Sequence, residues 1–167
     1  AKVLASLNHS GIAHLYGFER AAMPDGSGAY FLAMELVEGE TLRRRLGPGP
    51  LPMAELLDLG AQLADGLAKA HRAGIVHRDL KPENLFLCSS DAGALQVKVL
   101  DFGIAKLLDG GGGDDRTTRV GFFMGTPLYC APEQVYGGDV SPATDVYALG
   151  VVAFEALAGR PPFVGEI

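Results

Sequence analysis

The sequence predicts an α+β fold in which a small, strand-rich part precedes a larger, mainly helical part. Short apolar runs bounded by turn residues characterise residues 1–34 of the 167-residue chain. Two long segments with helical apolar spacing follow in residues 51–167. The glycine- and proline-rich stretch Gly47–Pro50 lies between the two parts. We therefore expect a small part over 1–34, a hinge and connector over 35–50, and a large part over 51–167.

Composition excludes several classes of protein. Hydrophobic residues make up 48% of the chain and charged residues 20%, which excludes a disordered polypeptide. The net charge of −6 argues against nucleic acid or an anionic membrane surface as a partner. The longest apolar run, Val146–Gly159, is too short to span a membrane and contains Glu155. Cys88 and Cys130 have no metal-ligand spacing and form no disulfide framework, which is typical of a reducing compartment.

The small part is expected to contain a helix and a β-hairpin. Ala1–Leu7 places its larger apolar residues on one helical face, and the polar residues 8–11 predict its end. Apolar runs at Ile12–Phe18 and Ala29–Met34 predict two strands. The turn-forming residues 23–28 lie between these runs, so the strands are expected to pair across a long loop.

Two long helices are expected in the large part. The first begins at Pro52, a residue suited to a first helical turn, and ends at Gly74. The second begins at Ser141, a favourable N-cap that proline follows, and ends at Gly159. Ahead of both, the consecutive arginines Arg43–Arg45 predict a solvated helix face.

Two short strands and a long loop are expected between these helices. Leu85–Cys88 and Val97–Leu100 predict strands that the turn residues 89–93 separate. Asp109–Arg119 contains glycine, aspartate and threonine without an anchoring apolar side chain, so it predicts a mobile loop.

Three motifs stand at the boundaries of the predicted elements. His77–Asn84 (HRDLKPEN) precedes the first short strand, and residues 101–103 (DFG) follow the second. Residues 125–133 (GTPLYCAPE) come after the predicted loop. These motifs, in this order, closely resemble the catalytic segments of protein kinases, and specifically those of the serine/threonine branch. The resemblance covers almost the whole chain and implies a truncated, two-lobed protein kinase-like fold. In that fold, residues 1–34 would be the remainder of the small lobe, and residues 51–167 the large lobe without its last helices.

The resemblance assigns chemical roles to four residues. Asp79 is expected to orient the attacking hydroxyl and accept its proton, and Lys81 to offset charge on the transferred phosphate. Asn84 and Asp101 supply oxygen atoms of the kind that Mg²⁺ prefers. The implied reaction transfers the γ-phosphate of ATP to a serine or threonine hydroxyl of a protein substrate, with ATP and Mg²⁺ as cofactors.

Other residues resemble the nucleotide site of the family. Met34, Glu35 and Val37 correspond to the gatekeeper and hinge, where main-chain groups would meet the adenine edge. Phe86 would form the floor below the adenine. Ordinary packing of strand residues is the alternative interpretation of all four.

A further set resembles the framework of an active kinase. Leu4, Leu15, His77 and Phe102 correspond to the stack of side chains that links the two lobes. Asp145 corresponds to the helix aspartate that fixes the catalytic-loop backbone. Simple core packing, or for Asp145 a capping or surface carboxylate, is the alternative in each case.

The resemblance also implies regulation. Arg78 directly precedes Asp79, and in the family this arginine pairs with a phosphorylated residue of the following loop. Thr117 and Thr118 are the candidates for that phosphorylation. The alternative is that both threonines only make the loop soluble.

Parts of the family pattern are missing from this chain. No G-x-G-x-x-G occurs, and no strand lysine precedes the first expected helix, so we expect both to lie upstream. The arginine expected to pair with Glu133 would lie downstream. An unpaired and partly buried Glu133 is destabilising, so we expect the isolated 167 residues to be a weak and unstable catalyst.

Two other functions stay open. The chain could belong to a pseudokinase or to a truncated, non-enzymatic module that binds nucleotide or partners. A small-molecule kinase is a further alternative, which the motif at 125–133 disfavours because it resembles a platform for a polypeptide. The run from Met34 to Leu42 resembles bacterial members of the family. We therefore expect a cytoplasmic segment without membrane contact, in a parent protein that a region outside this chain could anchor to a membrane.

Overall fold

The computed structural model describes residues 7–23, 27–89, 93–102 and 127–163. Predictions for Leu4, for Thr117 and Thr118, for nearly all of the first expected helix and for the loop at 109–119 lie outside these residues. The elements, in chain order, are β1 (Leu15–Ala22), β2 (Gly28–Met34), β3 (Glu40–Thr41), α2 (Leu42–Leu46), α3 (Met53–Arg72), the 3-10 helix η1 (Pro82–Asn84), β4 (Leu85–Ser89), β5 (Leu95–Val99), the 3-10 helix η2 (Pro127–Tyr129), α5 (Pro132–Val135) and α6 (Pro142–Ala158).

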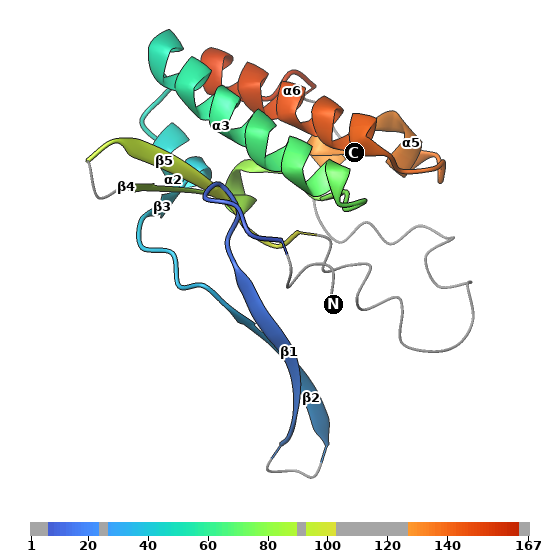
Figure 1. Cartoon of the computed structure of the whole chain (residues 1–167). Helices are drawn as coiled ribbons and strands as arrows, with labels where there is room; N and C mark the ends of the chain where they lie inside the picture. Colours follow the sequence, from blue (N-terminus) through green and yellow to red (C-terminus); the bar gives the residue numbers. More distant parts are fainter. Residues whose placement is uncertain (1–6, 24–26, 90–92, 103–126, 164–167) are drawn as a thin grey trace.

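The predicted hairpin is present and projects from the rest of the chain (Figure 1). Strands β1 and β2 pair in antiparallel fashion from Leu15 opposite Met34 to Ala22 opposite Gly28. The first strand begins three residues later than predicted. The cause is Ile12, which forms a parallel bridge with Val99 of β5 instead of joining the hairpin.

A second sheet of three strands supports the large part. Its order is β3-β4-β5, and both pairings are antiparallel. The strands β4 and β5 confirm the two short strands predicted from the sequence. Strand β3 and helix α2 lie within the predicted connector, where the sequence had indicated only a helical face at Arg43–Arg45.

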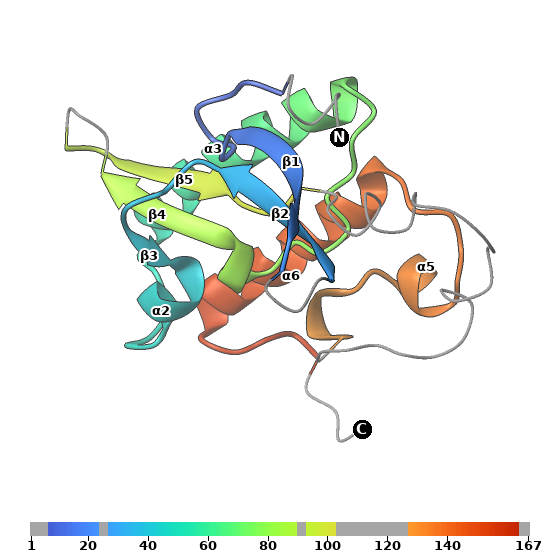
Figure 2. The ribbon, with the colours of Figure 1, turned by 90° about the horizontal axis from the view of Figure 1, so that it is seen from below.

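The two long helices are confirmed, and they run side by side above the second sheet (Figures 1 and 2). Ser141 caps α6 by accepting a hydrogen bond from the N–H of Ala143, and Gly159 ends it in the left-handed conformation with a φ of 70°. A single apolar core joins α3, α6, β4 and β5. Its side chains, such as Leu67, Leu85 and Val152, are almost fully buried and hold the helices on the sheet.

The prediction of a solvated face at Arg43–Arg45 is confirmed for Arg44 alone, since Arg45 is half-buried and pairs with Glu55 at 2.9 Å. The side chain of Arg44 is 81% exposed, as predicted, and its ion pair with Glu40 is long, at 3.6 Å. Arg43 instead turns toward α6 and forms an ion pair with Glu155 at 2.6 Å. The sequence places three arginines side by side, and nothing in that pattern indicates which of them pairs with the buried carboxylate of Glu155, more than a hundred residues away.

Gly39 is required by the close approach of two chain segments. Its φ is 154°, and a Cβ atom at this position would lie 2.1 Å from the carbonyl oxygen of Leu87. We expect Gly39→Ala to lower the free energy of unfolding by roughly 1–3 kcal/mol, because backbone atoms must move. The matched control is Gly60→Ala within α3, where the added Cβ would meet no atom within 4 Å apart from the adjoining backbone of its own helix.

Alanine is the better helix former, so Gly60→Ala should raise stability by up to about 1 kcal/mol. Urea unfolding of a folded domain that contains this chain, with each substitution, measures both effects. Equal unfolding midpoints for the two variants would contradict the close approach at Gly39.

Among the helices of the described residues, none combines the length and the apolar character that crossing a lipid bilayer requires.

Candidate active site

Backbone strain marks the positions of two predicted site residues. In the described part of the chain, the non-glycine residues with positive φ are Arg78, at 73°, and Asp101, at 59°. A left-handed conformation costs such a residue on the order of 1–2 kcal/mol and persists only where the surroundings enforce it. Arg78 directly precedes Asp79, and Asp101 begins the second motif. The strain therefore lies at the two places where the sequence predicts chemistry.

Asp79, Lys81 and Asn84 meet at one carboxylate. Lys81 Nζ donates to Asp79 Oδ2 at 2.7 Å, and Asn84 Nδ2 donates to the same oxygen at 3.2 Å. Asn84 Nδ2 also donates to the main-chain oxygen of Asp79 at 2.8 Å, which closes the loop on itself. The Asp79 side chain remains 63% exposed. An approaching hydroxyl group can therefore reach a carboxylate whose orientation is already fixed.

Asp101 is held next to this loop by main-chain contacts. The N–H of Leu100 donates to the carbonyl oxygen of Asn84 at 2.8 Å, and Asp101 follows directly. The amide nitrogen of Asn84 is engaged with Asp79, so its amide oxygen is the atom that a cation would take. Within the described residues no three His, Cys, Asp or Glu side chains group around a metal position. An amide oxygen from Asn84 and a carboxylate from Asp101 are donors of the kind that Mg²⁺ takes, with its other ligands coming from phosphates and water.

The His77 ring forms hydrogen bonds with a neighbour of each strained residue. Its Nδ1 accepts from the N–H of Asp79 at 3.2 Å, and its Nε2 lies 2.8 Å from the carbonyl oxygen of Leu100. Burial lowers the pKa of His77, so the ring is neutral and carries its hydrogen on Nε2, where it donates to Leu100. Phe102 packs edge-on against the ring, with 4.8 Å between ring centroids. The third described member of the predicted stack, Leu15, is also buried.

Asp145 supports the backbone of the loop formed by residues 77–84. Its carboxylate, on the first turn of α6, accepts from the N–H of His77 at 2.8 Å and from the N–H of Arg78 at 2.9 Å. His71 Nε2 lies 2.7 Å from the same carboxylate. The Asp145 side chain is 1% exposed. These contacts hold the backbone in the conformation that Arg78 would otherwise avoid.

The residues predicted to meet adenine lie around the link between the two sheets. Met34 ends β2, Val37 lies in the segment between β2 and β3, and both are half-buried. Phe86 lies on β4 opposite Thr41 of β3 and is also half-buried. Their roles in nucleotide binding stay predictions.

Glu35 connects the segment after β2 both with the residue that precedes β1 and with β5. Its carboxylate accepts from the N–H of His14, ahead of β1, at 3.1 Å and pairs with Lys98 of β5. The main-chain N–H of Glu35 donates to the carbonyl oxygen of His14 at 2.8 Å. Burial alone would raise the pKa of Glu35, but the hydrogen bonds from Lys98 and His14 lower it below its ordinary value of 4.5.

Because the resemblance to protein kinases predicts a nucleotide site at this link, we expect Lys98→Met, which removes a partner of Glu35, to raise the KM for ATP several-fold. A nucleotide titration measures the change, and Lys69→Met on the exposed face of α3 is the control.

Since the pKa of Glu35 is lowered in the folded state, its ion pair with Lys98 stabilises the fold above pH 4.5. This stabilisation is lost as the pH falls through the lowered pKa. The difference in stability between the wild type and Lys98→Met should therefore shrink in acid. A constant difference down to pH 3 would contradict this.

Glu133 has a partner within the chain. Its carboxylate accepts from the Thr144 hydroxyl on α6 at 2.6 Å, and this hydrogen bond lowers the pKa of Glu133. The sequence had suggested that Glu133 lacks a partner here. The structure supplies a neutral partner, while the predicted cationic partner stays untested.

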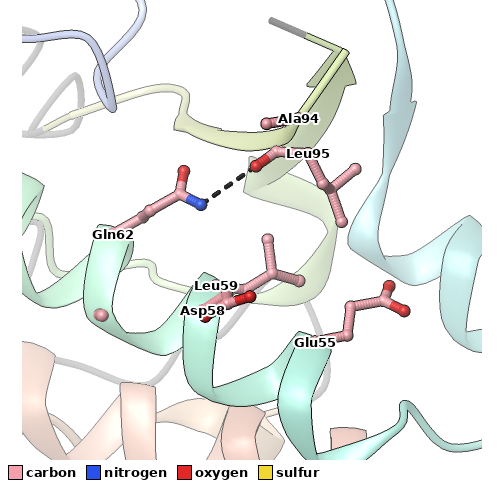
Figure 3. A pocket seen from close by; sticks show the side chains of 7 residues that line it. Glu55, Asp58, Leu59, Gln62, Ala94 and Leu95 are labelled. Atoms are coloured by element: carbon pink, nitrogen blue, oxygen red, sulfur yellow. Dashed lines mark hydrogen bonds between the residues drawn. The ribbon is translucent and has the colours of Figure 1, made fainter. Parts of the chain in front are cut away.

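A groove of about 620 Å³ lies apart from these residues, between α3 and the start of β5 (Figure 3). Gln62 joins its two walls, because its Nε2 donates to the carbonyl oxygen of Leu95 at 3.1 Å and its Oε1 accepts from the N–H of Val97 at 3.0 Å. The groove is lined by Glu55, Asp58, Leu59, Ala61, Gln62, Ala94 and Leu95. None of these was predicted from the sequence as a site residue, so the candidate active site is separate from this groove.

The sequence analysis did not identify two residues whose hydrogen bonds connect separate segments of the site. Gln134 Nε2 donates to the carbonyl oxygen of Arg78 at 2.7 Å, and its Oε1 accepts from the N–H of Ala131 at 3.0 Å. His71 contacts Asp145 from the last turn of α3. Both lie close in sequence to a recognised motif, but only the folded chain shows that they bridge to it.

Comparisons with known proteins show which family the chain resembles. The whole chain, residues 1–167, matches the sequence profile described as the protein kinase domain. Serine/threonine-protein kinase PknA of Mycobacterium tuberculosis is 44% identical, over 99% of this chain and 37% of PknA. Serine/threonine-protein kinase pkn2 of Myxococcus xanthus is 41% identical, over 100% of this chain and 19% of its own length.

Solved structures show the same fold. The crystal structure of the Mycobacterium tuberculosis PknI kinase domain matches with a TM-score of 0.71 and 30% identity, over 97% of this chain and 56% of that domain. The chain therefore spans well under two thirds of the length of each of these relatives.

Proposed function

Because this chain belongs to the protein kinase family, we propose that it carries the catalytic centre of a serine/threonine protein kinase. The proposed reaction transfers the γ-phosphate of ATP to a serine or threonine hydroxyl of a protein substrate. The main supporting observation is the Asp79 carboxylate, which is exposed toward substrate yet held by Lys81 and Asn84. This is the arrangement that a positioned proton acceptor requires.

Each residue of the centre has a separate task in this proposal. Asp79 orients the hydroxyl of the acceptor and takes its proton, and Lys81 neutralises charge that develops on the transferred phosphoryl group. Asn84 and Asp101 hold Mg²⁺, which shields the phosphates of ATP and orients them for transfer. The hinge at Glu35 and Val37 holds the adenine through main-chain groups, above Phe86.

We further propose that the motif at residues 125–133 receives a polypeptide rather than a small molecule. Gln134 supports this, because it fixes Ala131 of that motif to the backbone of Arg78, next to Asp79. Phosphorylation of Thr117 or Thr118 would add charge that Arg78 can bind, which is the proposed mode of activation. The same proposal includes a protein substrate with a serine or threonine acceptor. Because the proposed reaction uses ATP, we propose that this segment lies in the cytoplasm.

The test uses a complete kinase domain, because we propose that this chain supplies the end of the small lobe, the hinge and most of the large lobe. The domain is incubated with Mg-ATP and a protein acceptor, and the phosphorylated amino acids are identified. We expect phosphoserine or phosphothreonine. Phosphotyrosine alone would contradict the substrate class, and nucleotide binding without any transfer would support a pseudokinase.

A further inference from the structure

One arginine joins four separate elements beside the candidate catalytic loop. Arg43 lies on α2, and its Nε donates to Glu83 Oε1 on η1 at 2.8 Å. Its Nη1 donates to Glu155 Oε1 on α6 at 2.6 Å, and its Nη2 donates to the hydroxyl of Tyr129 on η2. A single planar guanidinium therefore holds together α2, η1, η2 and α6.

The charges of this cluster are fixed. The Glu155 side chain is 6% exposed and therefore needs a partner. Burial alone would lower the pKa of Arg43, but its hydrogen bonds to Glu155 and Glu83 raise the pKa instead. Burial and the hydrogen bond to Glu155 raise the pKa of Tyr129, so its phenol stays protonated and donates to Glu155 Oε2 at 2.5 Å. At neutral pH the cluster is one cation between two carboxylates.

The partners of Arg43 lie on both sides of the proposed reaction. Glu83 follows Lys81 by two residues and directly precedes Asn84. Tyr129 lies within the motif at 125–133, which we propose receives the polypeptide. Because the guanidinium is planar and presents its donors in a fixed fork, it sets the separation of the groups that bind it. The Arg43 cluster thus spans the gap between the catalytic loop and the proposed peptide platform.

We propose that Arg43 is a positioning residue that holds the peptide platform in register with Asp79 and Lys81. The proposal rests on the proposed protein kinase function, since it concerns how the protein acceptor is placed. The hydrogen-bond partners of Arg43 are Glu83, Tyr129 and Glu155. None of them belongs to the hinge at Glu35 and Val37, so we expect Arg43 to affect the placement of the acceptor. A purely structural role, in which Arg43 only neutralises the buried Glu155, is the alternative.

Two substitutions separate these roles without leaving Glu155 unpaired. Arg43→Lys keeps the positive charge but replaces the fork by a single ammonium group. Glu83→Gln removes only the outer carboxylate, whose side chain is 45% exposed. Arg44→Ala, on the same helix and largely exposed, is the matched control.

Each variant of the complete kinase domain is assayed with two acceptors. One is protein, supplied as the Asp79→Asn form of the same domain, and the other is water, measured as ATP hydrolysis. For both variants we expect kcat/KM for the protein acceptor to fall about tenfold or more, since small misplacements of a reactant are costly. ATP hydrolysis and the KM for ATP should stay within about twofold of wild type, since positioning acts on the protein acceptor alone.

Unchanged transfer to protein in both variants would overturn the positioning role while leaving the proposed function intact. Equal losses with both acceptors would also overturn it, because a general effect on folding lowers both. A wild-type domain that transfers phosphate to neither acceptor would overturn the proposed function itself. Additive losses in the Arg43→Lys, Glu83→Gln double variant would show that Glu83 acts without Arg43, again contradicting the proposal.

Discussion

Asp79→Asn is expected to lower the rate of phosphoryl transfer by about 10²–10⁴-fold, the range that a positioned general base contributes. The substitution keeps the shape of the side chain but replaces a carboxylate with an amide that cannot take the proton of the acceptor hydroxyl. Lys81 and Asn84 both donate to Asp79 Oδ2, so the amide also disturbs a carboxylate position that two donors fix. The initial rate of phosphate transfer to protein by a complete kinase domain is the measurement.

Asp139→Asn is the matched control, since Asp139 is exposed and lies between α5 and α6. Its rate should equal that of the wild type. The affinity for ATP should change little in Asp79→Asn, because the proposed nucleotide contacts are made elsewhere. If Asp79→Asn and Asp139→Asn transfer phosphate equally fast, Asp79 is not the proton acceptor and the role of the whole loop must be reassigned.

Asp145→Ala is expected to lower the free energy of unfolding by about 3–5 kcal/mol, the scale for removing one partner from a buried charged network. The Asp145 carboxylate is almost completely buried and accepts from the main-chain N–H groups of His77 and Arg78. Without it, both donors lose their partner and His71 loses its anion. Arg78 then loses the hydrogen bond made by its main-chain N–H, which weakens the support of its left-handed backbone. Urea unfolding of a complete kinase domain measures the loss.

Asp58→Asn, on the exposed side of α3, is the control for this substitution and should leave stability within about 0.5 kcal/mol. Asp145→Asn adds a second comparison, because one amide oxygen still accepts from a main-chain donor. Its loss of stability should lie between those of Asp58→Asn and Asp145→Ala. If Asp145→Ala unfolds in a single cooperative transition and loses less than about 1 kcal/mol of unfolding free energy, the hydrogen bonds of Asp145 do not hold the loop.

Much of the fold could be predicted because its signals are local. The helix α3 has apolar residues at helical spacing, and α6 has Ser141 and Gly159 at its ends, so each boundary has its own cause in the sequence. The hydrogen bonds among Asp79, Lys81 and Asn84 are local in the same sense, since the three residues lie within one loop. In each case, the residues that determine the local structure lie close together in the sequence.

The remainder depends on contacts between distant residues. Arg43 and Arg44 are equivalent in sequence, yet only Arg43 reaches the buried Glu155. The pair of Glu35 and Lys98 joins residues 63 positions apart, and no local pattern indicates it. The start of β1 was misplaced for the same reason, because the backbone of Ile12 pairs with β5. Such choices are made by tertiary packing, which sequence periodicity does not describe.

The most direct test of the proposed catalytic centre is phosphopeptide mass spectrometry of a complete kinase domain incubated with Mg-ATP, beside its Asp79→Asn form. We expect phosphate on a serine or threonine between residues 101 and 133, at Thr117 or Thr118, in the wild type and none in the variant. The same phosphopeptides in both forms, or none in either form while ATP is bound, would contradict the assignment of Asp79 and of the catalytic centre built around it.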